Sequence, residues 1–387
     1  MRRCAASAIA VVLLAGACVF GDSTAVTDAP PDSILPPPSE TPVTVATPRG
    51  VRSYELVVPP DLGRDPAPLI VAFHECCQDP TEFAASTRFD ELAKEEGFVV
   101  AYPRALDEVW DFEDRDHTDR PDVDDVAFVR EMIDAISETV PIDRDRVYAT
   151  GLLRGGGFAI LLACRMPGQI AAVATVGPLF HHDGAACEDP QPARVLVIVG
   201  ERSWAVVPGG IPPTDIPMAD PPRRLDQEIA DWVNTNRCRP IPEETMLPGD
   251  VQRSVYDCPN GAALDVYIHG GCCFWPKEDV WGIDATSTIW RFFERFDGPI
   301  AEGEGLSAAE TSFIDTARIA VGPGVSLTSP DGSLSSLGET ILDVGYWACT
   351  GPPAEFVRRF VGEVDTRGMS GDAPAGVLDA ALEYLCR

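Results

Sequence analysis

The chain has 387 residues, of which 45% are apolar, and its formal net charge at neutral pH is −31. This length and apolar content allow a large buried core and more than one domain, and they exclude disorder for most of the chain. The negative charge repels phosphate backbones and anionic lipid headgroups, so it argues against a nucleic-acid partner.

The N-terminus has the features of an export signal. Arg2 and Arg3 precede an apolar segment, residues 8–14, and small residues then lead to Cys18. We expect a signal peptide over residues 1–17, because the apolar segment is too short for an ordinary membrane span. The run LLAGAC also resembles a bacterial lipobox, in which Cys18 would carry the lipid; cleavage after a small residue without lipidation is the alternative. Residues 18–48 are rich in proline and are predicted to form a tether.

Strands and helices are predicted to alternate over residues 49–298. Apolar runs predict buried strands, and amphipathic or small-residue segments predict helices. The expected strands cover residues 52–58, 68–73, 98–102, 146–150, 170–176, 195–200 and 264–269; the expected helices cover residues 81–96, 124–139, 155–164 and 286–296. This order predicts a doubly wound, mostly parallel sheet whose ligand site lies at the carboxyl ends of its strands. His74, residues 200–208 and residues 269–276 follow such ends.

Residues 299–387 are predicted to form a small all-α domain. Apolar residues keep helical spacing at Leu337, Ile341, Val344 and Ala348, at Phe356 and Phe360, and at Leu378, Leu382 and Leu385. A domain of this size needs a covalent staple, and a Cys349–Cys386 disulfide is the natural one. Ten cysteines remain from Cys76 onward, an even number that favours disulfides in an exported chain.

Residues 147–158, VYATGLLRGGGF, have the outline of the strand, tight turn and helix that carries the nucleophile of an α/β-hydrolase. In that motif a Ser occupies the middle of GxSxG on a strained bend. Leu153 occupies this position here. The scaffold of the bend is therefore expected to persist without its reactive atom.

Several motifs occur in one order along residues 52–296. They are VPP from Val58, FHECCQ from Phe73, YP from Tyr102, DDVAFVR from Asp124, PIDRDRVYATGL from Pro141, LAC from Leu162 and GGCCFWP from Gly270. In these motifs the chain resembles the secreted polyhydroxybutyrate depolymerase and feruloyl esterase family of α/β-hydrolases. The resemblance implies the α/β-hydrolase fold and the activity of a serine esterase on carboxylic esters.

All three triad positions of that family are replaced in this sequence. The resemblance puts the serine at Leu153, the histidine at Cys273 and the acid at Ser203 or Trp204. A serine mechanism needs a base for the nucleophile and a group that orients the base, so three losses indicate that the mechanism is gone.

The expected oxyanion region is altered as well. Its backbone donors are expected near Arg154 and near Glu75 or Cys76, and the family has a glycine where this chain has Glu75. An apolar side chain at position 153 and a carboxylate at position 75 both oppose oxyanion stabilisation.

The resemblance and proximity imply two further disulfides, Cys164–Cys187 and Cys238–Cys258. Two vicinal pairs then remain, Cys76 with Cys77 and Cys272 with Cys273, on turns that face each other in this fold. We expect a disulfide that links the two turns and clamps the old site. A vicinal bridge within each pair is possible but strained, because it closes an eight-membered ring around one peptide bond. A zinc or Cu(I) site on these thiols, with help from His74 or His269, is the alternative. A Cys273 thiol nucleophile assisted by His74, His181 or His182 is a third possibility.

The sequence therefore favours an exported, catalytically degenerate esterase-fold protein that acts as a binding or scaffolding module for an unknown envelope ligand or protein. The alternatives are an active ester hydrolase with a rearranged site and a thiolate metal-binding protein. No cofactor is expected. Residues 336–349 and 381–386 resemble a small two-cysteine helical domain of unknown function in exported actinobacterial proteins, which suggests an interaction role.

Overall fold

The computed structural model describes residues 42–47, 50–111, 123–177, 190–203, 206, 224–300, 308–322, 326–327, 335–349, 360, 369 and 373–386. The signal peptide and Cys18 lie outside these residues. In the described part of the chain, no helix is both long enough and apolar enough to cross a membrane.

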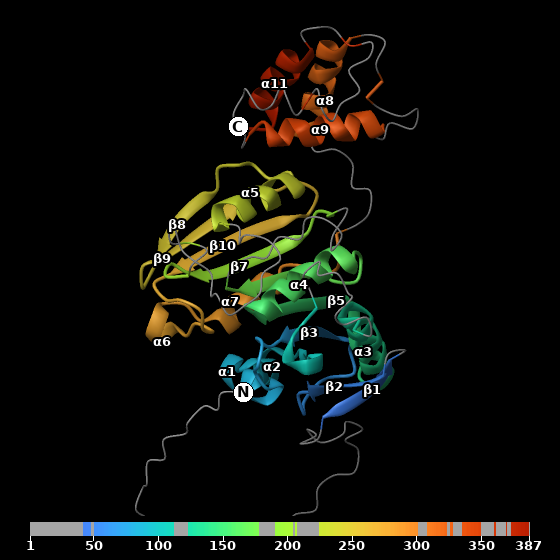
Figure 1. Cartoon of the computed structure of the whole chain (residues 1–387), viewed down its shortest axis with the longest axis vertical. Helices are drawn as coiled ribbons and strands as arrows, with labels where there is room; N and C mark the ends of the chain where they lie inside the picture. Colours follow the sequence, from blue (N-terminus) through green and yellow to red (C-terminus); the bar gives the residue numbers. More distant parts are fainter. Residues whose placement is uncertain are drawn as a thin grey trace, which may run out of the picture. The chain divides into compact units, whose positions relative to one another are not determined.

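One ten-stranded sheet organises the α/β region, with the strand order β1-β2-β4-β3-β5-β6-β7-β10-β9-β8 (Figure 1). The strands are β1 (Val43–Thr47), β2 (Gly50–Val57), β3 (Ala67–Phe73), β4 (Val99–Pro103), β5 (Ile142–Leu152), β6 (Ala172–Val176), β7 (Arg194–Gly200), β8 (Glu243–Leu247), β9 (Val251–Tyr256) and β10 (Ala263–His269). The six strands from β4 to β10 in that order pair in parallel, and antiparallel pairs flank them on both sides. The predicted doubly wound, mostly parallel α/β sheet is confirmed.

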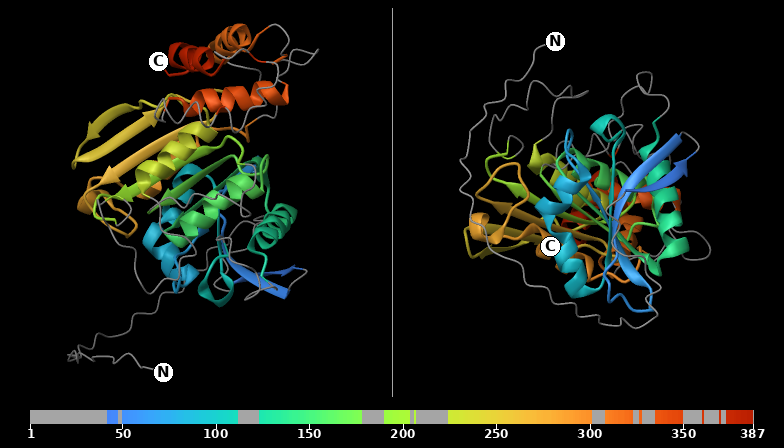
Figure 2. Two further views of the ribbon diagram at one scale, coloured as in Figure 1. Left: turned by 45° about the horizontal axis from the view of Figure 1, so that its top comes forward. Right: turned by 90° about the horizontal axis from the view of Figure 1, so that it is seen from below.

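Helices cover both faces of this sheet (Figure 2). They are α1 (Pro80–Thr87), α2 (Phe89–Glu96), α3 (Asp125–Thr139), α4 (Arg154–Arg165), α5 (Leu225–Thr235), α6 (Glu278–Trp281) and α7 (Ala285–Phe293). Leu69, Val71 and Phe73 of β3 pack in the core beneath α3, α4 and α5, whereas Ile70 and Ala72 pack in the core beneath α1, α2 and α7. Successive strand residues point to opposite faces, so a strand buried on both sides must be apolar throughout. This requirement explains the continuous apolar run of β3.

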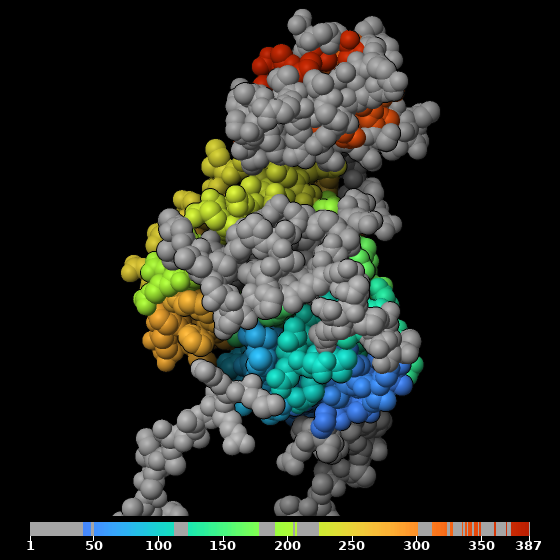
Figure 3. Space-filling view, viewed as in Figure 1, coloured from blue at the N-terminus to red at the C-terminus, as the bar shows by residue number. Residues whose placement is uncertain are grey.

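The single helix predicted over residues 81–96 is wrong, because the structure divides it into α1 and α2 at Arg88. Arg88 has φ 61° and ψ 26°, in the left-handed region. Phe83 and Phe89 both contact Trp275, with ring centroids 5.6 and 5.8 Å away. Residues six apart in one straight helix point in widely different directions, so the break lets both rings pack on the same indole. Figure 3 shows the blue surface of α1 and α2 and the orange surface of α6 on one face of the molecule.

Some elements were not predicted. Val43–Thr47, which the sequence prediction put within the tether, forms the edge strand β1 and pairs with β2. β8 and β9 extend the other end of the sheet, and α5 precedes them. Four of the five β8 residues are exposed, so this edge strand has no apolar alternation by which to recognise it.

The C-terminal segment contains α8 (Ala308–Val321), α9 (Ser336–Trp347) and α11 (Ala373–Tyr384) around a core of their own. Ile341, Val344 and Ala348 are buried there as predicted, and the predicted Cys349–Cys386 disulfide is present. The prediction was wrong for Leu382, which is 45% exposed because Val377, Ala380 and Ala381 face the core of this helix instead. Phe360 is buried in the same core, whereas Phe356 lies outside the described residues.

Candidate functional site

The turn between β5 and α4 keeps the backbone of a nucleophile elbow. Leu153 joins the end of β5 to the first residue of α4 and has φ 47° and ψ −110°. A non-glycine residue with this positive φ stores backbone strain, which is what the elbow imposes on its central residue. A Cβ atom on Gly155 would lie 2.2 Å from the backbone oxygen of Phe73, so only glycine allows α4 to approach β3 this closely. The strained turn has therefore persisted although the residue at its centre is a leucine.

The Leu153 side chain lies where the elbow would present a nucleophile. It is partly buried, and its Cδ2 atom packs so closely over Gly177 that a Cβ there would lie 2.6 Å away. Its backbone N–H donates to Val176 O at 2.8 Å, which fixes the turn against the end of β6. The position consequently supplies an apolar contact and no group able to attack a carbonyl carbon.

The Glu75 carboxylate binds the backbone donor that would stabilise an oxyanion. Arg154 N–H, from the residue after the elbow position, donates to Glu75 Oε2 at 2.6 Å. The backbone N–H and the thiol of Cys76 also hydrogen-bond to this carboxylate. In α/β-hydrolases the N–H of the residue after the nucleophile is one oxyanion-hole donor. Glu75 therefore occupies this donor with a carboxyl oxygen from the chain itself.

The surroundings of Glu75 shift the pKa of its carboxyl group in two opposite directions. Burial raises the pKa of Glu75, and the hydrogen bonds from Cys76 and from Arg154 N–H oppose that rise. Desolvation penalises the charged form, whereas backbone donors stabilise it. The same donors would stabilise the charge of a tetrahedral intermediate, so the carboxylate takes the place of a reacting oxyanion.

His74 is locked in the core and cannot act as a general base in this arrangement. It is 1% exposed; its Nε2 accepts from Ala105 N–H at 3.1 Å, and its Nδ1 lies 2.7 Å from Glu75 O. Since Nε2 accepts, Nδ1 must carry the proton and donate to the carbonyl. Burial also lowers the pKa of His74. Both ring nitrogens of His74 therefore form hydrogen bonds to the backbone.

The cysteines at the old site pair differently from the prediction. Cys272 and Cys273 are bonded to each other, and Cys76 and Cys77 are free thiols. The predicted clamp between the two turns is wrong. The Cys76 thiol hydrogen-bonds to Glu75, and Cys272 Sγ lies 3.8 Å from Arg202 O.

The disulfide also removes the two alternatives that needed thiols at positions 272 and 273. A bonded sulfur is neither a nucleophilic thiolate nor a metal ligand of the thiolate type. In the described ranges, no three His, Cys, Asp or Glu side chains form a group that could hold a metal ion. Neither Cys273 catalysis nor a tetrathiolate metal site fits this structure.

The other predicted site residues are placed as follows. Ser203, at the acid position after β7, is 1% exposed, and its N–H donates to Gly200 O at 2.9 Å. His269 ends β10, where its Nδ1 accepts from Gly271 N–H at 3.1 Å and burial lowers its pKa. Trp204, His181, His182 and Cys187 lie outside the described residues.

The two remaining predicted disulfides are Cys238–Cys258 and Cys164–Cys187. Cys238 and Cys258 are bonded as predicted. Cys164, at the end of α4, is also disulfide-bonded.

The sequence predicted Glu75 as a carboxylate near the oxyanion region. It did not predict the hydrogen bond from Arg154 N–H to Glu75, because that bond depends on how close β3 and α4 lie.

Parts of the chain are similar in sequence to known esterases. Residues 52–189 match the family model described as "Esterase PHB depolymerase". These matches support an esterase PHB depolymerase-like α/β-hydrolase family for the α/β region of the chain. The chain is 27% identical over 243 residues to "Putative esterase NocK" of Nocardia uniformis subsp. tsuyamanensis, covering 58% of this chain and 71% of that protein. It is 24% identical to "Feruloyl esterase B" of Piromyces equi, covering 54% of this chain and 40% of that protein.

A similar solved structure is the "Acetyl xylan esterase from Aspergillus awamori". It has 14% sequence identity and a TM-score of 0.49, and the match covers 66% of this chain and 99% of that chain.

The two free thiols of this esterase-like domain are expected to differ in reactivity. Burial, followed by the hydrogen bond and charge of Glu75, raises the pKa of Cys76 to about 12. At pH 8 a thiol of pKa about 12 is ionised to roughly one part in ten thousand, and only the thiolate reacts. Cys77 is exposed. We expect iodoacetamide to label Cys77 first and Cys76 at least a hundredfold more slowly, as measured by time-resolved peptide mass spectrometry.

The single variants Cys76→Ser and Cys77→Ser are the matched controls for this labelling. Cys76→Ser should keep the fast phase, and Cys77→Ser should remove it. Equal rates at the two positions would show that the Cys76 thiol is not held by Glu75.

Proposed function

We propose that this protein is a catalytically degenerate member of its esterase family that acts as a binding or scaffolding module of the cell envelope. The hydrogen bond from Arg154 N–H to the Glu75 carboxylate supports this proposal most directly. An active esterase must leave this donor open for the developing charge of the transition state. Here the Glu75 side chain already accepts the hydrogen bond from this donor.

The three triad positions support the same proposal. Leu153 supplies no nucleophile, Cys273 is bonded to Cys272 and supplies no base, and Ser203 cannot replace a carboxylate that orients a base. Nucleophile, base and orienting group act as one unit, so loss of all three removes the serine mechanism rather than slowing it.

An active ester hydrolase with a rearranged site is the second candidate. It would need another nucleophile beside another base. Of the described residues near the elbow, Cys76 has a pKa raised to about 12, and both ring nitrogens of His74 are engaged within the fold. Neither group meets the requirements for nucleophilic or general-base catalysis.

The disulfides fit an oxidising compartment outside the cytosol. With the N-terminal sequence, they support an exported protein that is anchored by a lipid on Cys18. The partner would then be an envelope ligand or protein, and the C-terminal helical domain would serve as a further interaction module.

An ester panel tests the proposal. Purified full-length protein is expected to give no saturable hydrolysis of short-chain nitrophenyl esters above the rate in buffer, and Leu153→Ser is expected to give none either. A serine restored without its base keeps a hydroxyl of unperturbed pKa, which is a poor nucleophile at neutral pH.

An active esterase of the same family, assayed in parallel, is the positive control for this panel. Saturable turnover by the wild-type chain that disappears in His74→Gln would favour the rearranged hydrolase. Turnover that appears only in Leu153→Ser would show that another base already serves the elbow.

A further inference from the structure

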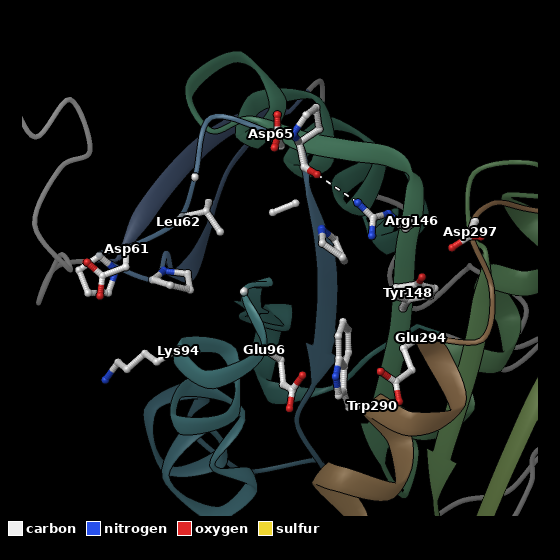
Figure 4. A pocket seen from close by; sticks show the side chains of 17 residues that line it. Asp61, Leu62, Asp65, Lys94, Glu96, Arg146, Tyr148, Trp290, Glu294 and Asp297 are labelled. Carbon is white, nitrogen blue, oxygen red and sulfur yellow. Dashed lines mark hydrogen bonds between the residues drawn. The ribbon is translucent and has the colours of Figure 1, made fainter.

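The carboxylates of the hollow near the amino ends of β3 and β5 do not converge (Figure 4). This hollow has a volume of about 640 Å³, and Asp61, Glu96 and Glu294 are among the acids that line it. Figure 4 shows these three side chains on separate segments and apart from one another. They therefore indicate no common ligand.

A second hollow, with a volume of about 420 Å³, lies between α7 and the strands β9 and β10. Residues of α6 also line it, together with Leu247 and Pro248 at the turn that follows β8. Pockets that hold small organic ligands commonly have volumes of roughly 300 to 1,000 Å³. This second hollow is therefore large enough for a small organic molecule.

Two glycines hold one wall of the second hollow in place. Gly249, in the turn between β8 and β9, and Gly282, which follows α6, have left-handed φ values of 79° and 72°. A Cβ atom on Gly249 would lie 2.6 Å from Cα of Gly282, so a larger residue would push the two turns apart. Gly282 and Pro248 both line the hollow. The backbone itself therefore forms this wall.

Three arginines, Arg253, Arg291 and Arg295, line the second hollow. Two of them converge on one oxygen, because Arg253 and Arg295 donate to Oδ2 of Asp265 at 3.3 and 3.0 Å. Asp265 is 2% exposed, so the position of its carboxylate is fixed within the fold. Arg291 lies four residues before Arg295, which places the two side chains on the same face of this helical segment.

The arginines carry more positive charge than their internal partner neutralises. Asp265 supplies one negative charge for two guanidinium groups, each of which has five N–H donors. In the described ranges, Arg291 forms no salt bridge. The other acids of the hollow are Glu278, which begins α6, and Asp284, which caps α7 about 10 Å along the helix axis from Arg291. Asp284 accepts from Ser287 N–H at 2.8 Å, so it is already bound to its own helix.

The charges and the apolar lining restrict the class of ligand. Guanidinium groups present a planar fork of donors that matches the two oxygens of a carboxylate or phosphate. Three arginines and three acids line the whole hollow, so a single negative charge fits its arginine end better than the double charge of a phosphate. Leu247, Ile283 and Phe292 supply apolar surface for the rest of the ligand.

We propose that the second hollow binds a small organic carboxylate with one negative charge. Its carboxylate would lie on the guanidinium groups of Arg291 and Arg295, and its uncharged body would lie against the apolar lining. The lining residues belong neither to the elbow nor to the turn that carries Glu75, so this inference goes beyond the proposed function. Ester hydrolysis by this chain would overturn the proposed function and leave this site standing.

Calorimetric titration of the full chain at pH 8 with benzoate, benzamide and phenyl phosphate tests the inference. Benzoate is expected to bind saturably, although the net charge of −31 repels anions in general. Benzamide keeps the ring without the charge, so it is expected to bind at least roughly tenfold more weakly. Phenyl phosphate is expected to bind no more tightly than benzoate, because its second charge meets no further cation.

Variants of single arginines separate the site from the net charge of the chain. Arg291→Gln leaves Asp265 with both of its arginines and is expected to weaken benzoate binding roughly tenfold. Arg291→Lys keeps the charge without the planar fork, so its affinity is expected to lie between those of the wild type and Arg291→Gln. Arg64→Gln removes the same charge from an exposed position in the loop between β2 and β3 and should leave binding unchanged.

Three results would overturn the proposal. They are a lack of saturable benzoate binding, equal binding of benzoate and benzamide, and benzoate affinity in Arg291→Gln that equals the affinity in Arg64→Gln. Tighter binding of phenyl phosphate than of benzoate would overturn the assignment of a singly charged ligand.

Discussion

Removing the Glu75 carboxylate is expected to raise ester hydrolysis about 10²- to 10³-fold in a variant whose triad has been rebuilt. The rebuilt variant carries Leu153→Ser, Ser203→Asp, Cys272→Ser and Cys273→His, and the comparison is between this variant and the same variant with Glu75→Gly. In the first, Arg154 N–H still donates to Glu75 at 2.6 Å, so one oxyanion donor is occupied. In the second, the donor is free for the charge that develops during acyl transfer. The measurement is kcat/KM for nitrophenyl acetate at pH 8.

Glu75→Gln in the same rebuilt background separates blockage from charge. The glutamine carbonyl can still accept from Arg154 N–H, so hydrolysis is expected to stay slow although the negative charge is gone. A fast glutamine variant would show that charge repulsion was the obstacle. Equal rates for the glutamate and glycine variants would show that Glu75 does not block the donor, and circular dichroism confirms that each variant is folded.

The sequence predicted the parts of the fold that depend on local pattern. Continuous apolar runs identified buried strands such as β3 and β7, because parallel strands covered on both faces tolerate few polar residues. The glycines around Leu153 predicted the elbow, since their spacing reflects backbone approach within the turn itself. The edge strand β8 was missed because four of its five residues are exposed, which removes the apolar signal, and β1 was missed because its residues were assigned to the proline-rich tether.

The sequence predicted only those features of the site that single positions or residues adjacent in the chain determine. Glu75 could be recognised as a carboxylate near the oxyanion region, and the loss of the triad could be read from single positions. The disulfide at Cys272 and Cys273 could not be predicted uniquely, because several pairings of the four cysteines satisfy the same sequence. The hollow near the amino ends of β3 and β5 could not be predicted, since Asp61, Glu96 and Glu294, which line it, come from segments far apart in the chain.

The elbow backbone is also expected to be a stability determinant in its own right, although its nucleophile is gone. Gly155→Ala should lower the free energy of unfolding by about 3 kcal/mol or more, because overpacking against rigid backbone leaves no flexible side chain to yield. The added Cβ would lie 2.2 Å from Phe73 O and 2.5 Å from His74 O, so α4 would have to move away from β3. For a domain of this size the loss corresponds to a fall in Tm of roughly 10 °C by differential scanning calorimetry.

Gly63→Ala is the matched control for this variant, since its Cβ would come no closer than 3.9 Å to Asp65 N, and its φ is not in the left-handed region. It should leave Tm unchanged or raise it slightly, because alanine lowers the entropy of the unfolded chain. If Gly155→Ala were as stable as Gly63→Ala, α4 would have to approach β3 less closely than this structure shows. The contact between Arg154 N–H and Glu75 depends on the same approach, so calorimetry of this one variant also tests the geometry from which the loss of catalysis is argued.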